Sequence, residues 1–532
     1  MRTATGSRQG VFYEVFVRAF ADGDGDGIGD LTGLTEKLDY LNDGRDETTD
    51  DLGVTGLWLM PIHPSPSYHG YDVTDYRDIH PDYGTLEDFR ALLDAAHTRG
   101  ISVIIDLVLN HTSSAHPWFV QSAARKEPYR NWYRWAEPEE DAYSLSAAVW
   151  GHPVWIPRNG SLYYAIFWDG MPDLNYDEPA VRQEMKDVAS FWLDMGVDGF
   201  RLDAVPHVYG TAELPDNGTG LTPTRAWWAE FQAHCRSVNP EVLLVGEVLD
   251  RLEVRLPYAD LFDSVFQVDF GETVATAVKG GGSRNDHLAL TLEQDLARYR
   301  AVNPDFLNTP ILSNHDQNRI FGLVGGKVDN MKLAASMVLL SEGLPFLYYG
   351  EELGMFGSKP DEDIRLPFVW GDDDAQTTWR TSRYTKVVDA ASQLADPDSL
   401  HAHYRRVIAL RTAHPALHAG KLSAVKAGNP AVVAWRLDTA GQIPPSQTVH
   451  SDAKKDHSAL VLFNLSTEPV DLTLSALGLS HEPWKLAFTQ HTDTAGLSEG
   501  LPVPADTPIH LHPKTTLVFI HDDTPANAGG KP

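Results

Sequence analysis

Three acidic side chains stand directly after apolar segments of this chain and are candidates for acid–base chemistry. Asp203 ends the run Gly-Phe-Arg-Leu-Asp, Glu247 follows Leu-Leu-Val-Gly, and Asp316 follows Ser-Asn-His. A carboxylate nucleophile paired with a carboxylic acid that donates a proton is the combination that cleaves glycosidic bonds. Acids from three separate segments can act together only if the fold brings the ends of those segments to one place.

The neighbours of these acids fit such roles. Arg201 precedes Asp203 by two residues, and residues i and i+2 of a strand share a face. The guanidinium group would favour the ionised form of Asp203, as a carboxylate nucleophile requires. The apolar run before Glu247 would raise its pKa towards that of a general acid. Any one acid could instead cap a helix or form an ion pair, but three acids at matching positions favour a shared site.

The elements that carry these acids alternate regularly up to about residue 410. Short apolar segments rich in β-branched and aromatic residues are separated by segments long enough for helices, and eight such strands are the number expected for a closed parallel barrel. The eight segments are 11–17, 54–62, 101–109, 197–204, 242–248, 264–270, 309–313 and 346–349. The candidate acids fall where the carboxyl ends of the strands would meet, and this is the end of a barrel where active sites form.

Local signals for two helices support this alternation. Thr85 begins Thr-Leu-Glu-Asp, a capping signature, and Gly100 can end the helix that follows. The second helix starts near Pro179, a residue suited to a first turn. Both helices lead directly into an apolar strand, as the helices of barrel units do.

The rest of the chain predicts two further units. About seventy residues between Leu109 and Pro179 are rich in Trp, Tyr, Pro and acids, and strand-like runs separated by turn residues follow position 415. We therefore predict an α/β fold in which a (β/α)8 TIM barrel is formed by residues 1–110 and 176–415. A small inserted domain after the third strand takes residues 111–175, and an antiparallel β-sandwich takes residues 416–532.

Four ordered motifs resemble those of the α-amylase family of glycoside hydrolases. They are Asp-Leu-Val-Leu-Asn-His at 106–111, Gly-Phe-Arg-Leu-Asp at 199–203, Gly-Glu at 246–247 and Asn-His-Asp at 314–316. Met-Pro-Asp-Leu-Asn at 171–175 is similar to a fifth motif, in the version of members intermediate between oligo-1,6-glucosidases and neopullulanases. The resemblance covers roughly residues 10–520. It implies a retaining reaction with Asp203 as nucleophile, Glu247 as acid/base and Asp316 as a transition-state stabiliser that holds sugar hydroxyls.

The resemblance also implies a set of substrate-binding residues. His111, Arg201 and His315 match positions that line the subsite of the attacked sugar. Tyr71 and Asp72 follow the second predicted strand, where a flat ring face and a bidentate acceptor suit a sugar. Ala204 is small, as in relatives that act on α-1,4 linkages, whereas α-1,6-specific glucosidases resemble one another in having Val there.

An acidic loop after the first strand predicts a calcium site. Its carboxylates and one backbone carbonyl match EF-hand positions one, three, five, seven and nine, and a glycine stands at position six. The predicted ligands are Asp22, Asp24, Asp26, Ile28 and Asp30. Gly33 replaces the bidentate Glu at position twelve, so we expect a static Ca²⁺ loop. The resemblance implies a second site at Asn110, Asp173 and the backbone carbonyl of His207.

Composition restricts the partners. Lys and Arg number 43 against 74 Asp and Glu, a formal charge of −31, which argues against nucleic acid or anionic membranes and permits a neutral oligosaccharide. Cys235 is the single cysteine, which excludes an intramolecular disulfide and a multi-cysteine zinc site. No apolar stretch approaches the ~20 residues of a membrane span. No signal peptide is visible, which fits a cytoplasmic protein or a secreted one whose signal has been removed; the oligomeric state stays open.

The sequence thus predicts a retaining α-glucoside hydrolase that acts on α-1,4-linked maltooligosaccharides or starch fragments. One alternative is an α-glucosidase or oligo-1,6-glucosidase. Another is a glucosyltransferase or isomerase such as trehalose synthase, because the segments at 36–40 and 203–206 are similar to that group. A non-catalytic homologue such as an amino-acid-transporter heavy chain is disfavoured, because this chain keeps all three acids and shows no membrane span.

Overall fold

The catalytic part of the chain is a closed parallel barrel. The computed structural model describes residues 8–45, 50–137, 148–210, 221–281, 287–371, 374–384, 386–439, 456–479, 483–490 and 497–522. The eight parallel strands are ordered β12-β11-β10-β9-β3-β2-β1-β13, and a parallel bridge between Ile311 and Phe346 joins the two edges. The strands are β1 (Phe12–Val15), β2 (Gly56–Leu59), β3 (Ser102–Leu107), β9 (Gly199–Leu202), β10 (Leu243–Gly246), β11 (Ser264–Gln267), β12 (Thr309–Pro310) and β13 (Phe346–Tyr348). The predicted barrel is confirmed, and each predicted strand segment contains one of these strands.

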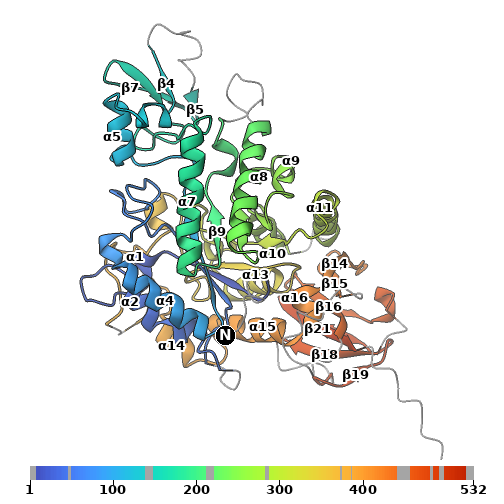
Figure 1. The fold of residues 1–532 in the computed structure, drawn as a ribbon. Coiled ribbons are helices and arrows are strands. Elements are labelled where there is room, and N and C mark those ends of the chain that lie inside the picture. The colour runs from blue at the N-terminus through green and yellow to red at the C-terminus, as the bar shows by residue number, and fades with distance from the viewer. Residues whose placement is uncertain are drawn as a thin grey trace, which may run out of the picture.

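Helices cover the outside of the barrel (Figure 1). The longer ones are α4 (Leu86–Thr98), α7 (Pro179–Met195), α8 (Leu221–Val238), α10 (Phe270–Gly280), α11 (Leu288–Val302), α13 (Val328–Leu339) and α15 (Leu400–Ala413). The shorter ones are α1 (Val17–Phe20), α2 (Leu31–Glu36), α3 (Leu38–Leu41), α5 (Pro117–Ala123), α9 (Leu252–Arg255), α12 (Ile320–Leu323), α14 (Ala390–Leu394) and α16 (Pro415–Ala419). Among the described residues, no helix has both the length and the apolar character required to cross a membrane.

Helix α4 shows how local sequence sets these elements. The Thr85 side chain accepts the backbone N–H of Asp88, and the Asp88 side chain accepts the backbone N–H of Thr85, so the expected capping box is present. Phe89, Leu92 and Leu93 are buried on the face that the helix turns to the barrel. Reciprocal capping and an apolar stripe together fix where the helix starts and which side faces the core.

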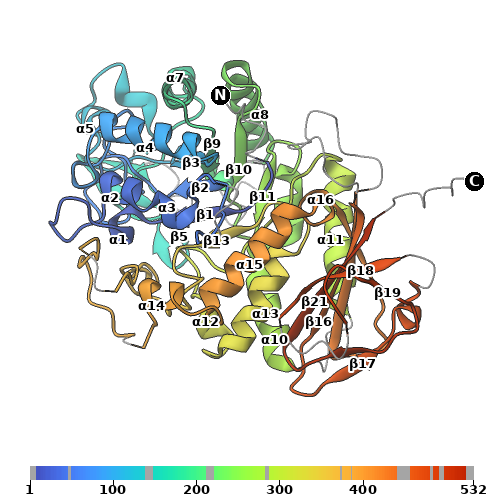
Figure 2. The same cartoon turned by 90° about the horizontal axis from the view of Figure 1, so that it is seen from below.

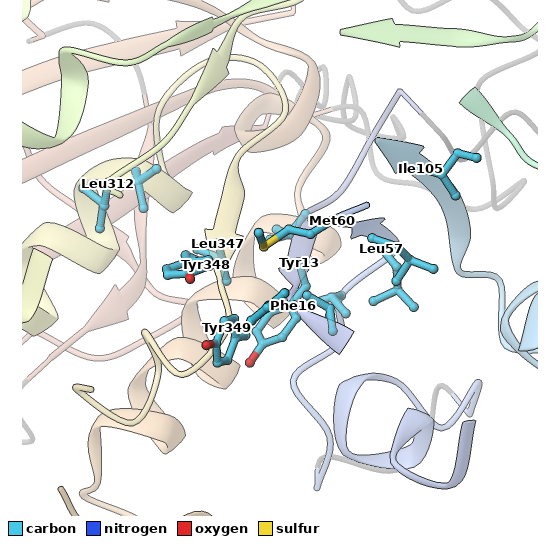
Figure 3. Close-up of a cluster of buried hydrophobic side chains, with 14 of the residues drawn as sticks. Tyr13, Phe16, Leu57, Met60, Ile105, Leu312, Leu347, Tyr348 and Tyr349 are labelled. Carbon is cyan, nitrogen blue, oxygen red and sulfur yellow. The ribbon is translucent and has the colours of Figure 1, made fainter. Parts of the chain in front are cut away.

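Alternate residues of the barrel strands belong to two different clusters. Phe12, Trp58, Ile104, Leu243, Val245, Phe266, Ile311, Leu344 and Phe346 form a separate cluster inside the barrel. The residues between them in sequence point outward and join the large core beneath the helices. Figure 3 shows part of that core, with Tyr13, Leu57, Ile105 and Leu347 from four neighbouring strands.

The segment between β3 and α7 forms small sheets of its own, at the top of Figure 1. Three antiparallel strands are ordered β4-β8-β7, and two more form a hairpin. Their bounds are β4 (Trp135–Ala136), β5 (Ala148–Val149), β6 (His152–Pro153), β7 (Trp155–Arg158) and β8 (Ser161–Tyr164). Antiparallel bridges from His111 to Asp173 and from Tyr133 to Leu174 join the two ends of the segment.

The C-terminal part is antiparallel, as predicted. One sheet is ordered β14-β15-β16-β21-β18-β19, and β17 pairs with β20 in a second. The bounds are β14 (Lys421–Ala424), β15 (Val432–Asp438), β16 (Asp456–Asn464), β17 (Val470–Leu472), β18 (Trp484–Thr489), β19 (Pro502–Val503), β20 (Ile509–Leu511) and β21 (Thr515–Asp522). These strands lie beside α13 and α16 (Figure 2), and Trp435 Nε1 donates to the Leu340 carbonyl at 2.9 Å across that boundary.

Candidate active site

The polar side chains of the candidate site form the next layer of the barrel interior, above the apolar cluster. Since side chains two residues apart share a face of a strand, an inward apolar residue is followed by another inward residue at i+2. Glu14 follows Phe12, Asp106 follows Ile104, Arg201 follows Gly199, and Glu247 follows Val245 in this way. This alternation places Glu247 directly after the carboxyl end of β10, and Asp203 follows Arg201 by the same step directly after β9. Asp316 lies in the segment that follows β12.

Arg201 is the centre of this layer. Its Nη1 lies 2.7 Å from Asp106 Oδ1 and 2.7 Å from Asp203 Oδ1, and its Nη2 lies 2.6 Å from Glu247 Oε1. The backbone N–H of Ala204 donates to Glu247 Oε2 at 2.9 Å. Arg201 is 1% exposed, so one buried cation offsets part of the cost of burying three carboxyl groups.

Asp316 is held by a second group of side chains. Its Oδ2 lies 3.0 Å from His315 Nε2, and its Oδ1 lies 3.0 Å from Arg365 Nη2. On the opposite side of the imidazole, His315 Nδ1 lies 2.6 Å from Glu14 Oε1. The hydroxyl of Tyr71 lies 2.6 Å from His315 Nε2 and donates to Asp106 Oδ2 at 3.0 Å, which links the two groups.

The three acids differ in their pKa values because their surroundings differ. Burial raises the pKa of Asp203 to about 6, although Arg201 works in the opposite direction. Burial raises the pKa of Glu247 to about 7, again against Arg201 and with a contribution from Asp203. Burial would also raise the pKa of Asp316, but His315 and Arg365 outweigh it and hold that pKa well below its usual range. Near neutral pH the site thus contains ionised Asp203 and Asp316 and a partly protonated Glu247.

These values refine one expectation. Arg201 does stabilise the charge of Asp203, as predicted, yet the net pKa shift is upward because the loss of solvent is the larger effect. For Glu247 the predicted upward direction agrees with the structure.

The predicted sugar-binding residues lie around this site. The ring of Tyr71 stacks on that of His315 with centroids 5.5 Å apart, and Arg201 lies 5.7 Å from the Tyr71 ring centre. Asp72 is buried, and its Oδ1 accepts hydrogen bonds from Ser67 and, at 2.6 Å, from Ser65. These contacts link Tyr71 directly to the Arg201 group and tie Asp72 to the loop that follows β2.

His111 lies on the side of the inserted segment. Its ring contacts that of Phe167, with centroids 5.1 Å apart, and Phe167 also contacts His207 at 5.6 Å. His111 Nε2 is buried without a hydrogen-bond partner, and burial lowers the pKa of His111 to about 3. A neutral imidazole with a free nitrogen is suited to a hydrogen bond with a sugar hydroxyl.

Two of the three residues of the second metal prediction meet. Asn110 Nδ2 donates to Asp173 Oδ2 at 3.2 Å, and Asp173 Oδ1 accepts the backbone N–H of Ile166 at 3.0 Å. Asn110 Oδ1 is buried without a partner. The ring of His207 contacts that of Phe167, which in turn contacts the ring of His111, the neighbour of Asn110 in sequence.

The acidic loop brings three of its five predicted ligands together. Carboxylate oxygens of Asp22, Asp24 and Asp30 lie within 4.8 Å of one another. Asp22 and Asp30 are buried, and backbone N–H groups of the loop also point to them, from Gly27 to Asp22 Oδ2 at 2.7 Å for example. Asp26 is exposed and lies outside the group; its Oδ1 accepts the backbone N–H of Ile28 at 2.7 Å. The three acids can hold a metal ion.

Glu14 and Arg365 were not predicted as residues of the site, and Asp106 was predicted only as the first residue of a motif, without a role. Glu14 and Asp106 stand alone as charges within apolar strands, and this was the available signal, because an acid inside a barrel strand needs a partner in the interior. Arg365 lies in the loop after β13, where no periodicity marks it, and only the fold brings it to Asp316.

Comparisons with known proteins agree with this geometry. The sequence profile of the alpha-amylase catalytic domain matches residues 14–420. The chain is 43% identical to alpha-amylase 3 of Dictyoglomus thermophilum, covering 81% of this chain and 82% of that protein. It is 31% identical to the trehalose synthase/amylase TreS of Mycolicibacterium smegmatis, covering 88% and 86%. The crystal structure of an alpha-amylase from H. orenii superposes with a TM-score of 0.84 at 40% identity, covering 97% of this chain and 100% of that one.

Proposed function

Because this chain belongs to the α-amylase family of glycoside hydrolases, we propose that Asp203, Glu247 and Asp316 carry out its reaction. The chain is a retaining α-glucoside hydrolase. The assignment of individual roles rests on one observation above all: Arg201 contacts the carboxyl groups of both Asp203 and Glu247 with its two terminal nitrogens. Two carboxyl groups on one guanidinium are compatible with the ~5 Å separation of retaining glycosidases.

The reaction proceeds by double displacement. Ionised Asp203 attacks the anomeric carbon while the glycosidic bond breaks, and Glu247 donates its proton to the departing oxygen. Glu247, now a carboxylate, removes a proton from water, and the resulting hydroxide displaces Asp203 from the anomeric carbon with a second inversion. The raised pKa of Glu247, about 7, supports its role as the group that is protonated in the first step and ionised in the second.

Asp316 and His315 bind the sugar in the subsite where the bond breaks. Asp316 stays ionised because His315 and Arg365 contact its two oxygens, so it can accept hydrogen bonds from two neighbouring sugar hydroxyls. A fixed negative charge also stabilises the positive charge that develops on the ring in the transition state. His111, Arg201, Tyr71 and Asp72 complete the subsite.

The substrate we propose is an α-1,4-linked maltooligosaccharide or starch fragment. The alpha-amylase relatives support this choice, and so does the small side chain of Ala204 directly after Asp203. The Ala204 backbone lies in the left-handed region at φ 50°, where a β-branched residue would be more strained than alanine. Transfer to a second sugar instead of water is the alternative, supported by the trehalose synthase/amylase relative.

The products of maltoheptaose separate these alternatives. Time-resolved chromatography should show mixed shorter maltooligosaccharides from an endo-acting hydrolase, and glucose alone from an exo-acting one. Incubation with maltose is the complementary test: trehalose formed without net release of glucose would contradict the hydrolase assignment. Asp203→Asn is the control for contaminating activity in both assays.

For the acidic loop we propose a Ca²⁺ site formed by Asp22, Asp24 and Asp30 with the carbonyl of Ile28. Asp26, the fifth predicted ligand, lies outside this group, and its carboxylate accepts the Ile28 N–H instead. The fit rests on the donor set: three carboxylates within 4.8 Å repel one another unless a cation joins them, and oxygen donors are those that Ca²⁺ prefers. The loop lies away from the reacting acids in sequence and caps α2, where Asp30 Oδ1 accepts the Gly33 N–H at 2.8 Å. Its cation would act on stability.

Asn110, Asp173 and the carbonyl of His207 form the second proposed Ca²⁺ site. The buried, unpartnered Oδ1 of Asn110 fits an oxygen ligand that awaits a cation, because a buried acceptor without a partner is costly. Asp173 supplies the charge, and its pKa of about 7, raised by burial, makes binding weaker in acid.

A further inference from the structure

Glu14 is a buried carboxylate that the mechanism above does not use. It lies in β1, two residues after Phe12 on the face that points into the barrel, and is 1% exposed. An isolated charge is strongly destabilising in such a place, so the partner of Glu14 indicates what the carboxylate does.

That partner is His315. Glu14 Oε1 lies 2.6 Å from Nδ1 of the histidine, while Nε2 on the other side of the ring lies 3.0 Å from Asp316 Oδ2 and 2.6 Å from the Tyr71 hydroxyl. A neutral imidazole has one N–H and can donate to only one of two carboxylates. An ionised carboxylate at each nitrogen requires the doubly protonated ring. Burial raises the pKa of Glu14, and the contact with His315 works against that rise by favouring the ionised form.

We propose that Glu14 is a positioning residue that keeps a proton on Nδ1 of His315, so that the histidine stays an imidazolium and presents its Nε2–H to Asp316 and the sugar. The inference rests on the proposed roles of Asp316 and His315 in binding the reacting sugar. Glu14 itself touches neither the substrate nor the reacting atoms and acts through the histidine.

Among the described residues, the charged groups around the imidazole are Asp316 beside it, Glu14 from β1, Asp106 from β3, Arg201 from β9, and Arg365, whose Nε donates to the His315 carbonyl at 3.1 Å. The neutral hydroxyl of Tyr71, from the loop after β2, also lies at Nε2. Burial lowers the pKa of His315, but Asp316 and Glu14 outweigh it and raise the pKa to about 9. Removing the charge of Glu14 takes away one of these two anionic neighbours and leaves the burial unchanged.

The direct test is the protonation of His315 in three variants. Glu14→Gln keeps the shape of the side chain and removes its charge, whereas Glu14→Asp keeps the charge. Glu352→Gln is the control, because Glu352 is also a buried carboxylate but accepts hydrogen bonds from the hydroxyl groups of Tyr13 and Tyr40. The side-chain ¹⁵N shifts of His315, assigned by the loss of signal in His315→Gln, report the proton on each nitrogen between pH 5 and 10.

We expect both nitrogens to be protonated at pH 8 in the native protein and in Glu352→Gln. In Glu14→Gln the titration midpoint of His315 should fall by about two pH units, within the range that one close opposite charge produces. In Glu14→Asp the midpoint should lie at least halfway back to the native value. A native His315 with one unprotonated nitrogen at pH 8 would overturn the proposal without any variant. An unchanged midpoint in folded Glu14→Gln would overturn it as well.

The kinetic readout separates positioning from a merely structural role. If the midpoint falls from about 9 to about 7, Glu14→Gln should lose kcat/KM about tenfold at pH 8, and the deficit should shrink to less than about twofold at pH 6. A deficit that is equal at both pH values would contradict the proposal. Failure of the catalytic assignment itself would appear differently, as near-normal activity in Asp203→Asn, whatever the state of His315.

Discussion

The pH dependence of kcat/KM should be a narrow bell whose two limbs belong to Asp203 and Glu247. Asp203 must be ionised to attack, so activity falls as pH drops below its pKa of about 6. Glu247 must be protonated to assist the leaving group, so activity falls as pH rises above its pKa of about 7. Since the two groups share Arg201, the limbs report values of the pair. The active protonation state is most populated near pH 6.5 and about sevenfold less at pH 5 or pH 8.

Replacing Glu247 by Gln tests which limb belongs to which residue. Natural oligosaccharides need a proton on the departing oxygen, so Glu247→Gln should lose at least about a thousandfold in kcat/KM on maltoheptaose. An α-maltotriosyl fluoride has a leaving group that needs far less acid assistance, and this substrate should retain measurable fluoride release. With it, the variant should keep the acid limb and lose the alkaline one. The same alkaline limb in the variant and in the native enzyme would refute the assignment of Glu247.

Three further predictions concern the metal and the fold. Excess EGTA should lower the melting temperature of the native protein, and it should lower that of Asp24→Asn by less. In Asp305→Asn, an exposed control, EGTA should lower the melting temperature as much as in the native protein. An equal decrease in Asp24→Asn and Asp305→Asn would contradict the site at the acidic loop. Thr85→Ala removes the capping box of α4 and should cost about 1 kcal/mol of unfolding free energy in urea titration. Gly271→Ala should cost about 2 kcal/mol or more by the same measurement, because its Cβ would stand 1.8 Å from the Leu312 carbonyl oxygen; equal stability to the native chain would contradict the packing of α10.

The parts of this protein that the sequence predicted are those set by local periodicity. The i, i+2 spacing of Arg201 and Asp203 predicted a shared face, and the two side chains are 2.7 Å apart. The capping signature at Thr85 and the proline at 179 marked the starts of α4 and α7. These features depend on neighbours within one element and need no knowledge of the fold.

The remainder depends on contacts between distant segments. Arg365 reaches Asp316 from a loop forty-nine residues later in the chain. Glu14 meets His315 because barrel closure leaves only β13 between β1 and β12. The net direction of the Asp203 pKa also could not be predicted, because Arg201 and burial oppose each other and the extent of burial is a property of the closed barrel. Of the four carboxylates predicted for the acidic loop, the structure gathers those of Asp22, Asp24 and Asp30 and leaves Asp26 outside the group.

The central claim is that Asp203 forms a covalent bond to the sugar, and trapping that intermediate tests it most directly. A 5-fluoro-α-glucosyl fluoride reacts with the nucleophile of a retaining enzyme and slows the hydrolysis of the product, so peptide mass spectrometry can locate the attached sugar. We predict one fluoroglucosyl group per chain, on the peptide that contains Asp203, and no attachment in Asp203→Asn. Attachment to Glu247 or Asp316 would contradict the mechanism.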